Sequence, residues 1–196
     1  MNLKINITRD TAGPALSRLI ESLKRRRPLN AALGKRAELE LRDHFLLRNE
    51  EPNKKGWPKQ NFWNRIRTAT AVSAINEEGA TVSVADPAFA QKYYGGQITP
   101  KESKYLAIPA IASAYGKSPL SLPELVPIVR FLDGSRRAIA LGTRKTEGFI
   151  HNVETIYYWL VKQVNQDKDP EAFPDAQRFK DALLEETRDA VSSALK

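Results

Sequence analysis

The sequence predicts an α+β fold, with N-terminal helices and a C-terminal helix packed on a mainly antiparallel sheet that carries a long proline-rich loop. Two observations predict the helices and the sheet. Apolar residues recur at helical spacing before residue 50 and after residue 174, and runs of β-branched and aromatic residues lie between them. The density of proline over residues 110–127 predicts the loop. We expect a single domain spanning residues 1–196, because this length is ordinary for one domain.

The composition excludes several classes of protein. There is no cysteine, which excludes disulfides, thiolate zinc sites and cysteine nucleophiles. No apolar run approaches the roughly 20 residues of a membrane span, and the N-terminus shows no secretory signal. We therefore expect a protein that stays in the cytoplasm and has no membrane partner.

The first fifty residues predict a strand and two helices. Residues 3–7 alternate apolar and polar side chains, as in a half-buried strand. A helix is expected from residues 10 or 11 to Pro28, with one apolar stripe and with its basic residues in the last turn, where cations are favourable. A long helix is expected over residues 28–50, because apolar residues recur there every four positions from Leu33 to Phe45.

Two polar features of the long helix have structural explanations. Glu38 and Arg42 are spaced to form an ion pair along the helix. His44 stands beside the apolar stripe without a second histidine at metal-binding spacing, so we interpret it as a packing residue rather than a ligand.

Residues 44–63 end the long helix in a turn rich in aromatic residues. Trp57, Phe62 and Trp63 lie within seven positions, beside Lys54 and Lys55. Such a cluster either pins helices onto a sheet or presents rigid aromatic anchors to a partner, and the first role is favoured.

The middle of the chain predicts most of the sheet. Residues 70–75 and 80–84 predict a hairpin, whose turn carries Glu77 and Glu78 as solvated carboxylates rather than an acid–base pair. The remaining expectations are a short helix over 87–94 stopped by Gly95 and Gly96, a strand over 105–108, the irregular loop over 110–127, and strands over 128–132 and 137–141 around a turn at 133–135.

The last fifty residues predict a strand and a helix. Residues 149–164 are rich in β-branched and aromatic side chains, which favours a strand, although periodicity does not exclude a helix. The spacing of apolar residues predicts a terminal helix over 174–195.

No group of residues in the sequence predicts catalysis or cofactor binding. The two histidines, His44 and His151, are isolated, and we expect no catalytic, cofactor-binding or metal-binding residue. A sugar-cleaving enzyme would need two carboxylates, one with a raised pKa, and the sole carboxylate in a suitable apolar context is Glu154. We therefore expect no enzyme, with this activity as a minor alternative.

The net charge of +8 raises the alternative of a nucleic-acid-associated protein that binds DNA. The basic residues are scattered and no common nucleic-acid motif is present, so a generic basic surface is favoured. The candidate basic surface comprises Arg25, Arg26, Arg27, Lys54, Lys55, Arg136 and Arg137.

Several short motifs resemble the phage virion-morphogenesis or tail-completion proteins of Mu-like and related tailed phages and prophages. The similar segments cover roughly residue 36 to the C-terminus, apart from a long insertion around residues 110–150. They are Asn53, Gly56-Trp57 and Phe62-Trp63, the alanine-rich hairpin, residues 94–101 and 104–109, residues 158–164, Asp169-Pro170 and Phe173-Pro174.

The resemblance implies a structural virion protein without enzymatic activity. Such a protein completes the phage tail or neck by assembling as a ring, with a hexamer as the expected form, and helps head–tail joining. Its implied partners are further copies of itself, other tail, neck or connector proteins, and DNA in passage. The implied location is the host cytoplasm during assembly and then the virion. We assign the candidate assembly interface to Trp57, Phe62, Trp63, Tyr115, Pro119, Leu122 and Pro123.

Overall fold

The computed structural model describes residues 12–132, 136–147 and 150–195, which form two compact units. Unit 1 comprises Met1–Glu50, Trp63–Phe89 and Pro170–Lys196, and unit 2 comprises Glu51–Phe62 and Ala90–Asp169. Helices near both ends and antiparallel strands between them confirm the predicted α+β fold. The expected strand at residues 3–7 lies outside the described residues.

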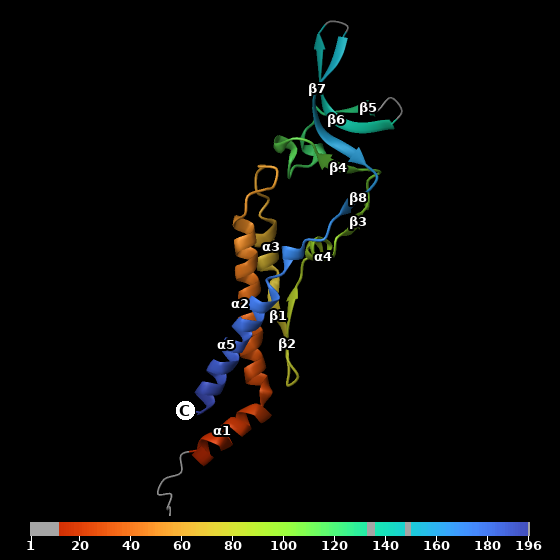
Figure 1. The fold of residues 1–196 in the computed structure, drawn as a ribbon. Helices are drawn as coiled ribbons and strands as arrows, with labels where there is room; N and C mark the ends of the chain where they lie inside the picture. Colours follow the sequence, from red (N-terminus) through yellow and green to blue (C-terminus); the bar gives the residue numbers. More distant parts are fainter. Residues whose placement is uncertain (1–11, 133–135, 148–149, 196) are drawn as a thin grey trace, which may run out of the picture. The chain divides into compact units, whose positions relative to one another are not determined.

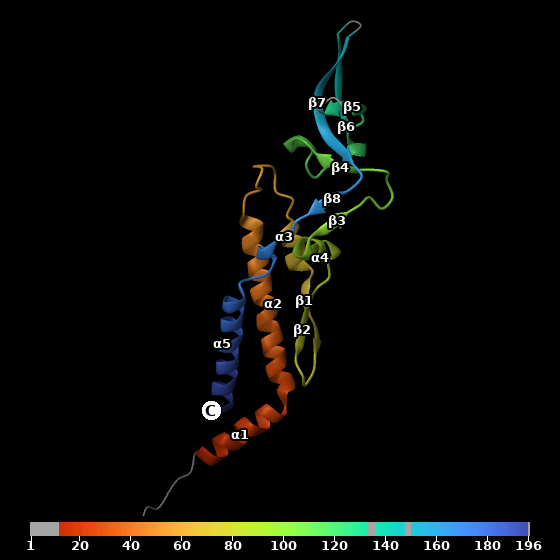
Figure 2. The ribbon, with the colours of Figure 1, turned by 45° about the vertical axis from the view of Figure 1, so that its right-hand side comes forward.

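Unit 1 is built around its longest helix. Its elements are α1 (Ala12–Lys24), α2 (Arg26–Glu50), most of α3 (Phe62–Thr68), β1 (Thr70–Ile75), β2 (Ala80–Val84), the start of α4 (Pro87–Tyr94) and α5 (Ala176–Leu195). In both ribbon views α2 lies between α5 and the β1–β2 hairpin (Figure 1 and Figure 2). Two sides of α2 are therefore covered within the unit.

Aromatic rings form the core of unit 1. Phe45 of α2 is fully buried; its ring stacks on Trp63 of α3 at 5.9 Å between centroids and meets Phe89 of α4 edge-on at 5.4 Å. Ile66 of α3 is also fully buried. Because large rings contribute most to the apolar area removed from water, this cluster holds the three helices together.

The β1–β2 hairpin packs closely on α2. Gly34 of α2 faces the hairpin at a point where an added Cβ would lie 2.6 Å from the Ala80 Cβ. Arg42 of α2 donates to the Thr70 carbonyl at 2.9 and 3.1 Å and pairs with Glu38 at 3.1 Å, which confirms the predicted ion pair. The approach of helix to strand therefore depends on a missing side chain and on one arginine.

The boundary between α1 and α2 differs from the expectation. The chain was expected to stay helical up to Pro28, but α1 ends at Lys24 and α2 begins at Arg26, with Pro28 in its first turn. That position suits proline because the first-turn N–H groups have no helical acceptor. The expectation that the basic run ends the first helix was wrong for Arg26 and Arg27, which lie at the positive end of the α2 dipole.

A carboxylate from the hairpin turn caps the start of α2. The Arg27 backbone N–H donates to Glu77 Oε2 at 3.1 Å, and Asn30 Nδ2 donates to the Asn76 carbonyl at 2.9 Å. Glu77 is an exposed turn residue, as expected, and it also accepts from one of the free N–H groups at the start of α2.

Unit 2 is built around a four-stranded antiparallel sheet with the order β4-β7-β6-β5. Its strands are β4 (Leu106–Pro109), β5 (Val126–Leu132), β6 (Arg136–Glu147) and β7 (Ile150–Val161), and a separate pair joins β3 (Gly96–Ile98) to β8 (Val164–Gln166). The side chains buried in this unit include Ala114, Ile128, Ala140 and Tyr158. The core of unit 2 therefore lies on the sheet and under the loop that precedes β5.

Most of the predicted elements are confirmed. The hairpin at 70–84, the helix at 87–94 and the strand at 105–108 are present to within one residue, and β7 confirms the strand favoured over 149–164. Strands β5 and β6 pair as predicted but are longer, and their turn at 133–135 lies outside the described residues. The loop at 110–127 contains two short 3-10 turns, Ala112–Ala114 and Pro119–Ser121.

The polypeptide crosses between the two units four times, after residues 50, 62, 89 and 169. Two of these crossings fall within helices α3 and α4. Compactness alone therefore does not separate the units into independent domains, and the single domain stays a prediction. Within the described residues, no helix combines the length and apolarity that a membrane crossing requires.

Candidate assembly surfaces

The two tryptophans of the aromatic turn belong to different units. Trp57 packs against Tyr115 in unit 2, with ring centroids 5.3 Å apart, and Lys55 Nζ lies 4.6 Å from the centre of its ring. Trp63 stacks on Phe45 in unit 1, where the Arg48 guanidinium lies 5.1 Å from its centre. The turn is thus not one aromatic cluster. Trp63 packs between helices of unit 1, whereas Trp57 packs against the 110–127 loop of unit 2.

The loop of unit 2 presents a leucine that the sequence interpretation missed. Leu120 is 94% exposed. The turn that carries it is fixed by Ser118, whose Oγ accepts from the Leu120 N–H at 3.3 Å and whose carbonyl accepts from Ser121 Oγ at 2.7 Å. The available signal was Ser118 followed by Pro119, which predicts a tight turn at Leu120 but not its exposure.

The other predicted interface residues of the loop are less accessible. Pro119 and Leu122 are half-buried, as are Trp57, Phe62 and Tyr115, and Pro123 is exposed. The structure brings Trp57 and Tyr115 together from separate stretches of the chain. Their role in assembly stays a prediction.

The hydroxyl of Tyr158 of β7 contacts the backbone of the 110–127 loop. It lies 3.0 Å from the Ala114 carbonyl and 3.1 Å from the Lys117 carbonyl, and the side chain is 1% exposed. Burial raises the pKa of the Tyr158 phenol above its usual 10.0, because the charged phenolate would lose its hydration there. The loop thus has a fixed base and an exposed apolar tip.

The candidate basic surface divides between the units. Arg25, Arg26 and Arg27 are exposed at the junction of α1 and α2, and their guanidinium groups make no ion pair within the described part of the chain. Lys54 and Lys55 are exposed in unit 2. The side chains of Arg136 and Arg137 lie outside the description. Among the described members of the candidate basic surface, the junction is therefore the larger group, beside the pair Lys54 and Lys55.

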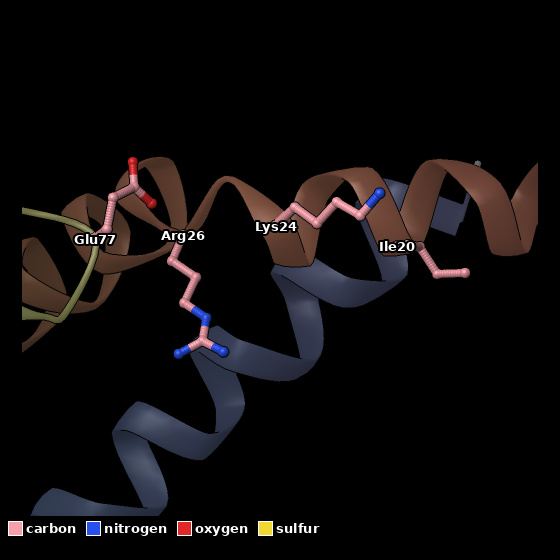
Figure 3. Close-up of a pocket in the computed structure, with 4 residues that line it drawn as sticks. All are labelled: Ile20, Lys24, Arg26 and Glu77. Carbon is pink, nitrogen blue, oxygen red and sulfur yellow. The ribbon is translucent and has the colours of Figure 1, made fainter.

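A hollow of about 490 Å³ adjoins this junction. It is lined by Ile20, Lys24, Arg26 and Glu77, which Figure 3 shows on α1, on the start of α2 and on the hairpin turn. Leu16, Ile20 and Lys24 follow one another at four-residue spacing and so share one side of α1. Although α1 packs against α5, Leu16 is 55% and Ile20 53% exposed. We call Leu16, Ile20, Lys24, Arg25 and Arg26 the α1 surface.

A second exposed surface lies on the C-terminal half of α2. Leu39, Leu46 and Leu47 are 43%, 39% and 50% exposed, and Asp43 and Glu50 are exposed beside them. At about 100° per residue these five positions fall within an arc of about 100° on the helix. We call them the α2 face. The sequence interpretation missed it because the stripe from Leu33 to Phe45 already explained the helix.

The polar residues considered for chemistry have structural contacts. His44 Nε2 lies 2.9 Å from the Glu171 carbonyl, which agrees with a packing role. Among the described residues, no group of three or more histidine, aspartate or glutamate side chains could hold a metal ion. The side chains of His151 and Glu154 lie outside the description, and the absence of an enzymatic activity stays a prediction.

We compared the sequence with models of protein families and with curated proteins, and compared the fold with solved structures, and none of the three comparisons gave a match.

Proposed function

We propose that this protein is a structural component of a phage virion that assembles with copies of itself into a ring and completes the tail or neck. The motifs that resemble tail-completion proteins support this function. One structural observation carries it: large apolar side chains are more often exposed than buried among the residues described.

The buried large apolar residues are Leu41, Phe45, Ile66, Phe89, Ile128 and Tyr158. The exposed ones are Leu16, Ile20, Leu39, Leu46, Leu47, Tyr93, Tyr94, Leu120, Val129, Phe173 and Leu184. Single exposed apolar residues are common on monomers, but exposed residues that gather on one helix face or one loop tip are typical of surfaces that a protein partner covers.

A ring explains these surfaces better than a single partner does. A ring subunit needs two different patches, because each copy contacts one neighbour on each side through unlike surfaces. The chain offers exposed apolar groups in both units, at Leu120 in unit 2 and on two helices of unit 1. In the proposed role the protein assembles in the host cytoplasm, joins tail, neck or connector proteins, and encloses DNA in passage.

The mass of the purified full-length chain tests this function. Light scattering should give a mass several times 22.0 kDa, either for the protein alone or after addition of phage tails. Negative-stain images should show rings. A mass of 22.0 kDa at all concentrations, with no binding to tails, would contradict the proposal.

Leu120 offers a point test of the loop. Replacing residues 112–125 as a block would also remove Ala114 and the carbonyls that Tyr158 contacts, so a single substitution is cleaner. Leu120→Ser should weaken ring or tail assembly while leaving the monomer folded, because the side chain makes little contact within the chain. Ala112→Ser, at another exposed position of the same loop, is the matched control. Equal assembly of the two variants would remove the loop from the interface.

A DNA-binding function is the second candidate, and the exposed guanidinium groups of Arg25, Arg26 and Arg27 favour it. Binding through them should weaken steeply as salt rises, because phosphate contacts release counterions. Replacing all three by alanine should reduce both the affinity for duplex DNA and its dependence on salt. Absence of binding at low salt would exclude this function.

A further inference from the structure

We propose that copies of this chain join head to tail through unit 1, with the α1 surface of one copy packed on the α2 face of the next. This inference rests on the proposed self-assembly and names its interface and its polarity. It commits to a second copy as the occupant of both surfaces.

The two surfaces are complementary in charge. The α1 surface combines two exposed apolar residues with Lys24, Arg25 and Arg26, and Lys24 alone of these cations has an ion pair, with Glu21 at 3.0 Å, within the described residues. The α2 face combines three exposed leucines with two carboxylates; Glu50 already has an interaction within the chain, and Asp43 is the exposed carboxylate on which the charge match depends. Matched charges at the edge of an apolar contact set its orientation and disfavour wrong pairings.

The two surfaces are also complementary in shape. Leu39, Asp43 and Leu47 follow one another at four-residue spacing and form a ridge along α2, with Leu46 beside it. The α1 surface has a hollow lined by Ile20, Lys24, Arg26 and Glu77, which leaves room for a side chain from a neighbouring helix. Helices pack through such ridges and grooves.

The lengths of the helices exclude this contact within one chain. Helix α1 has 13 residues and so spans about 20 Å, and it joins α2 at Arg25. Folded back along α2, it would reach about 20 Å, to the level of Leu39. Leu46 lies about 30 Å from the start of α2, beyond that reach. An α1 surface that covers the whole α2 face must therefore belong to another copy.

Other partners match only one of the two surfaces. Duplex DNA would contact the cations but would leave Leu16 and Ile20 exposed. An anionic lipid surface suits the basic and apolar α1 surface, but it would be repelled by the two carboxylates of the α2 face. A second copy matches both surfaces at once.

Two variants, each defective in one surface, test the proposal on the full-length protein. R25E/R26E reverses the charge of the α1 surface, and L39S/L46S removes two of the three exposed leucines of the α2 face. Each alone should raise the dissociation constant of self-association at least about tenfold. K101E/K162E, which changes the net charge equally at exposed positions of unit 2 outside the 110–127 loop, is the matched control and should assemble like the wild type.

Mixing the two defective variants gives the decisive result. Their mixture retains one intact pairing, between the α1 surface of L39S/L46S and the α2 face of R25E/R26E. It should therefore form a dimer of twice 22.0 kDa that does not grow further, which also shows that both variants are folded. Adding Asp43→Arg to R25E/R26E should restore self-association, because the exchanged charges attract again.

The outcomes separate this inference from the proposed function. A wild-type protein that stays monomeric and does not bind tails overturns both. A wild-type ring that tolerates R25E/R26E and L39S/L46S keeps the function and overturns this interface. The interface also falls if the mixture forms no dimer, or if R25E/R26E abolishes binding to phosphatidylserine vesicles or duplex DNA while self-association is unchanged.

Discussion

Tyr158 is the residue through which the irregular segment before β5 is tied to the sheet. Its hydroxyl is buried and within hydrogen-bond distance of the Ala114 and Lys117 carbonyls. Tyr158→Phe keeps the ring but leaves these carbonyls without that donor. We expect a loss of about 1–3 kcal/mol in the free energy of unfolding, measured by urea denaturation. An unchanged stability would show that water replaces the hydroxyl.

The raised pKa of Tyr158 gives this prediction a pH dependence. Below the usual value of 10.0 the phenol is neutral in both states, so its contribution to stability is complete. Above that value the unfolded tyrosine ionises first and binds fewer protons than the folded one, so stability falls as pH rises. The advantage of the wild type over Tyr158→Phe should therefore shrink above pH 10 and stay constant below it.

Glu77 is the residue that caps a free backbone N–H at the start of α2. Its carboxylate accepts from the Arg27 N–H, and the adjacent Glu78 side chain makes no such contact in the described chain. Glu77→Ala should lower the free energy of unfolding by about 0.3–1 kcal/mol at low salt, with a smaller effect at high salt. Glu78→Ala is the matched control. Equal effects of the two substitutions would mean that only net charge matters.

At the scale of elements, the packing of the β1–β2 hairpin on α2 requires a glycine. Alanine at position 34 would favour the helix by about 1 kcal/mol but would bring its Cβ 2.6 Å from the Ala80 Cβ. We expect Gly34→Ala to destabilise the protein by about 1–2 kcal/mol net, since the hairpin must shift.

The double variant with Ala80→Gly isolates this contact. Removing the Ala80 Cβ leaves Val72 at 3.6 Å as the nearest neighbour of the new methyl group, an ordinary contact distance. The cost of Gly34→Ala should therefore largely disappear in the Ala80→Gly background, and a double-mutant cycle measures the coupling. Additive effects would indicate that the hairpin does not approach α2 so closely.

Sequence patterns predicted the elements well where one local signal was sufficient. The hairpin at 70–84 follows from alternation around a glycine-containing turn, and α4 ends just before Gly95, whose added Cβ would meet the Gln166 carbonyl at 2.7 Å. The break between α1 and α2 was placed wrongly because Pro28 suits the first turn of a helix as well as the residue after one. Choosing between them requires the Glu77 contact, which comes from 50 residues away.

The candidate surfaces were predicted less completely than the fold. The sequence indicated the contributing stretches, such as the loop at 110–127, but named Leu122 and missed Leu120. It also treated Trp57 and Trp63 as one cluster, although they pack in different units. Exposure depends on which neighbours cover a side chain, and those neighbours come from distant segments that local patterns do not identify.

At the scale of the whole molecule, the chain path predicts how the two units unfold. Helix α4 begins in unit 1, where Phe89 is part of the core, and ends in unit 2. The next crossing lies beside it, because Asp169 N–H donates to the Lys92 carbonyl at 3.1 Å and the two side chains form an ion pair at 3.4 Å. Unfolding either unit alone would break α4, and unfolding unit 2 would also release this pair.

We therefore expect the two units to unfold together in a single transition. In calorimetry of a variant that does not self-associate, the calorimetric and van't Hoff enthalpies should agree, at about 0.7 kcal/mol per residue for the full chain near 60 °C. Fluorescence of Trp63 alone, after replacing Trp57 and Trp159 by phenylalanine, should report the same midpoint as fluorescence of Trp57 alone. Two separate midpoints would establish independent domains. The shared helices and crossing segments would then contribute too little free energy to make the two cores unfold together.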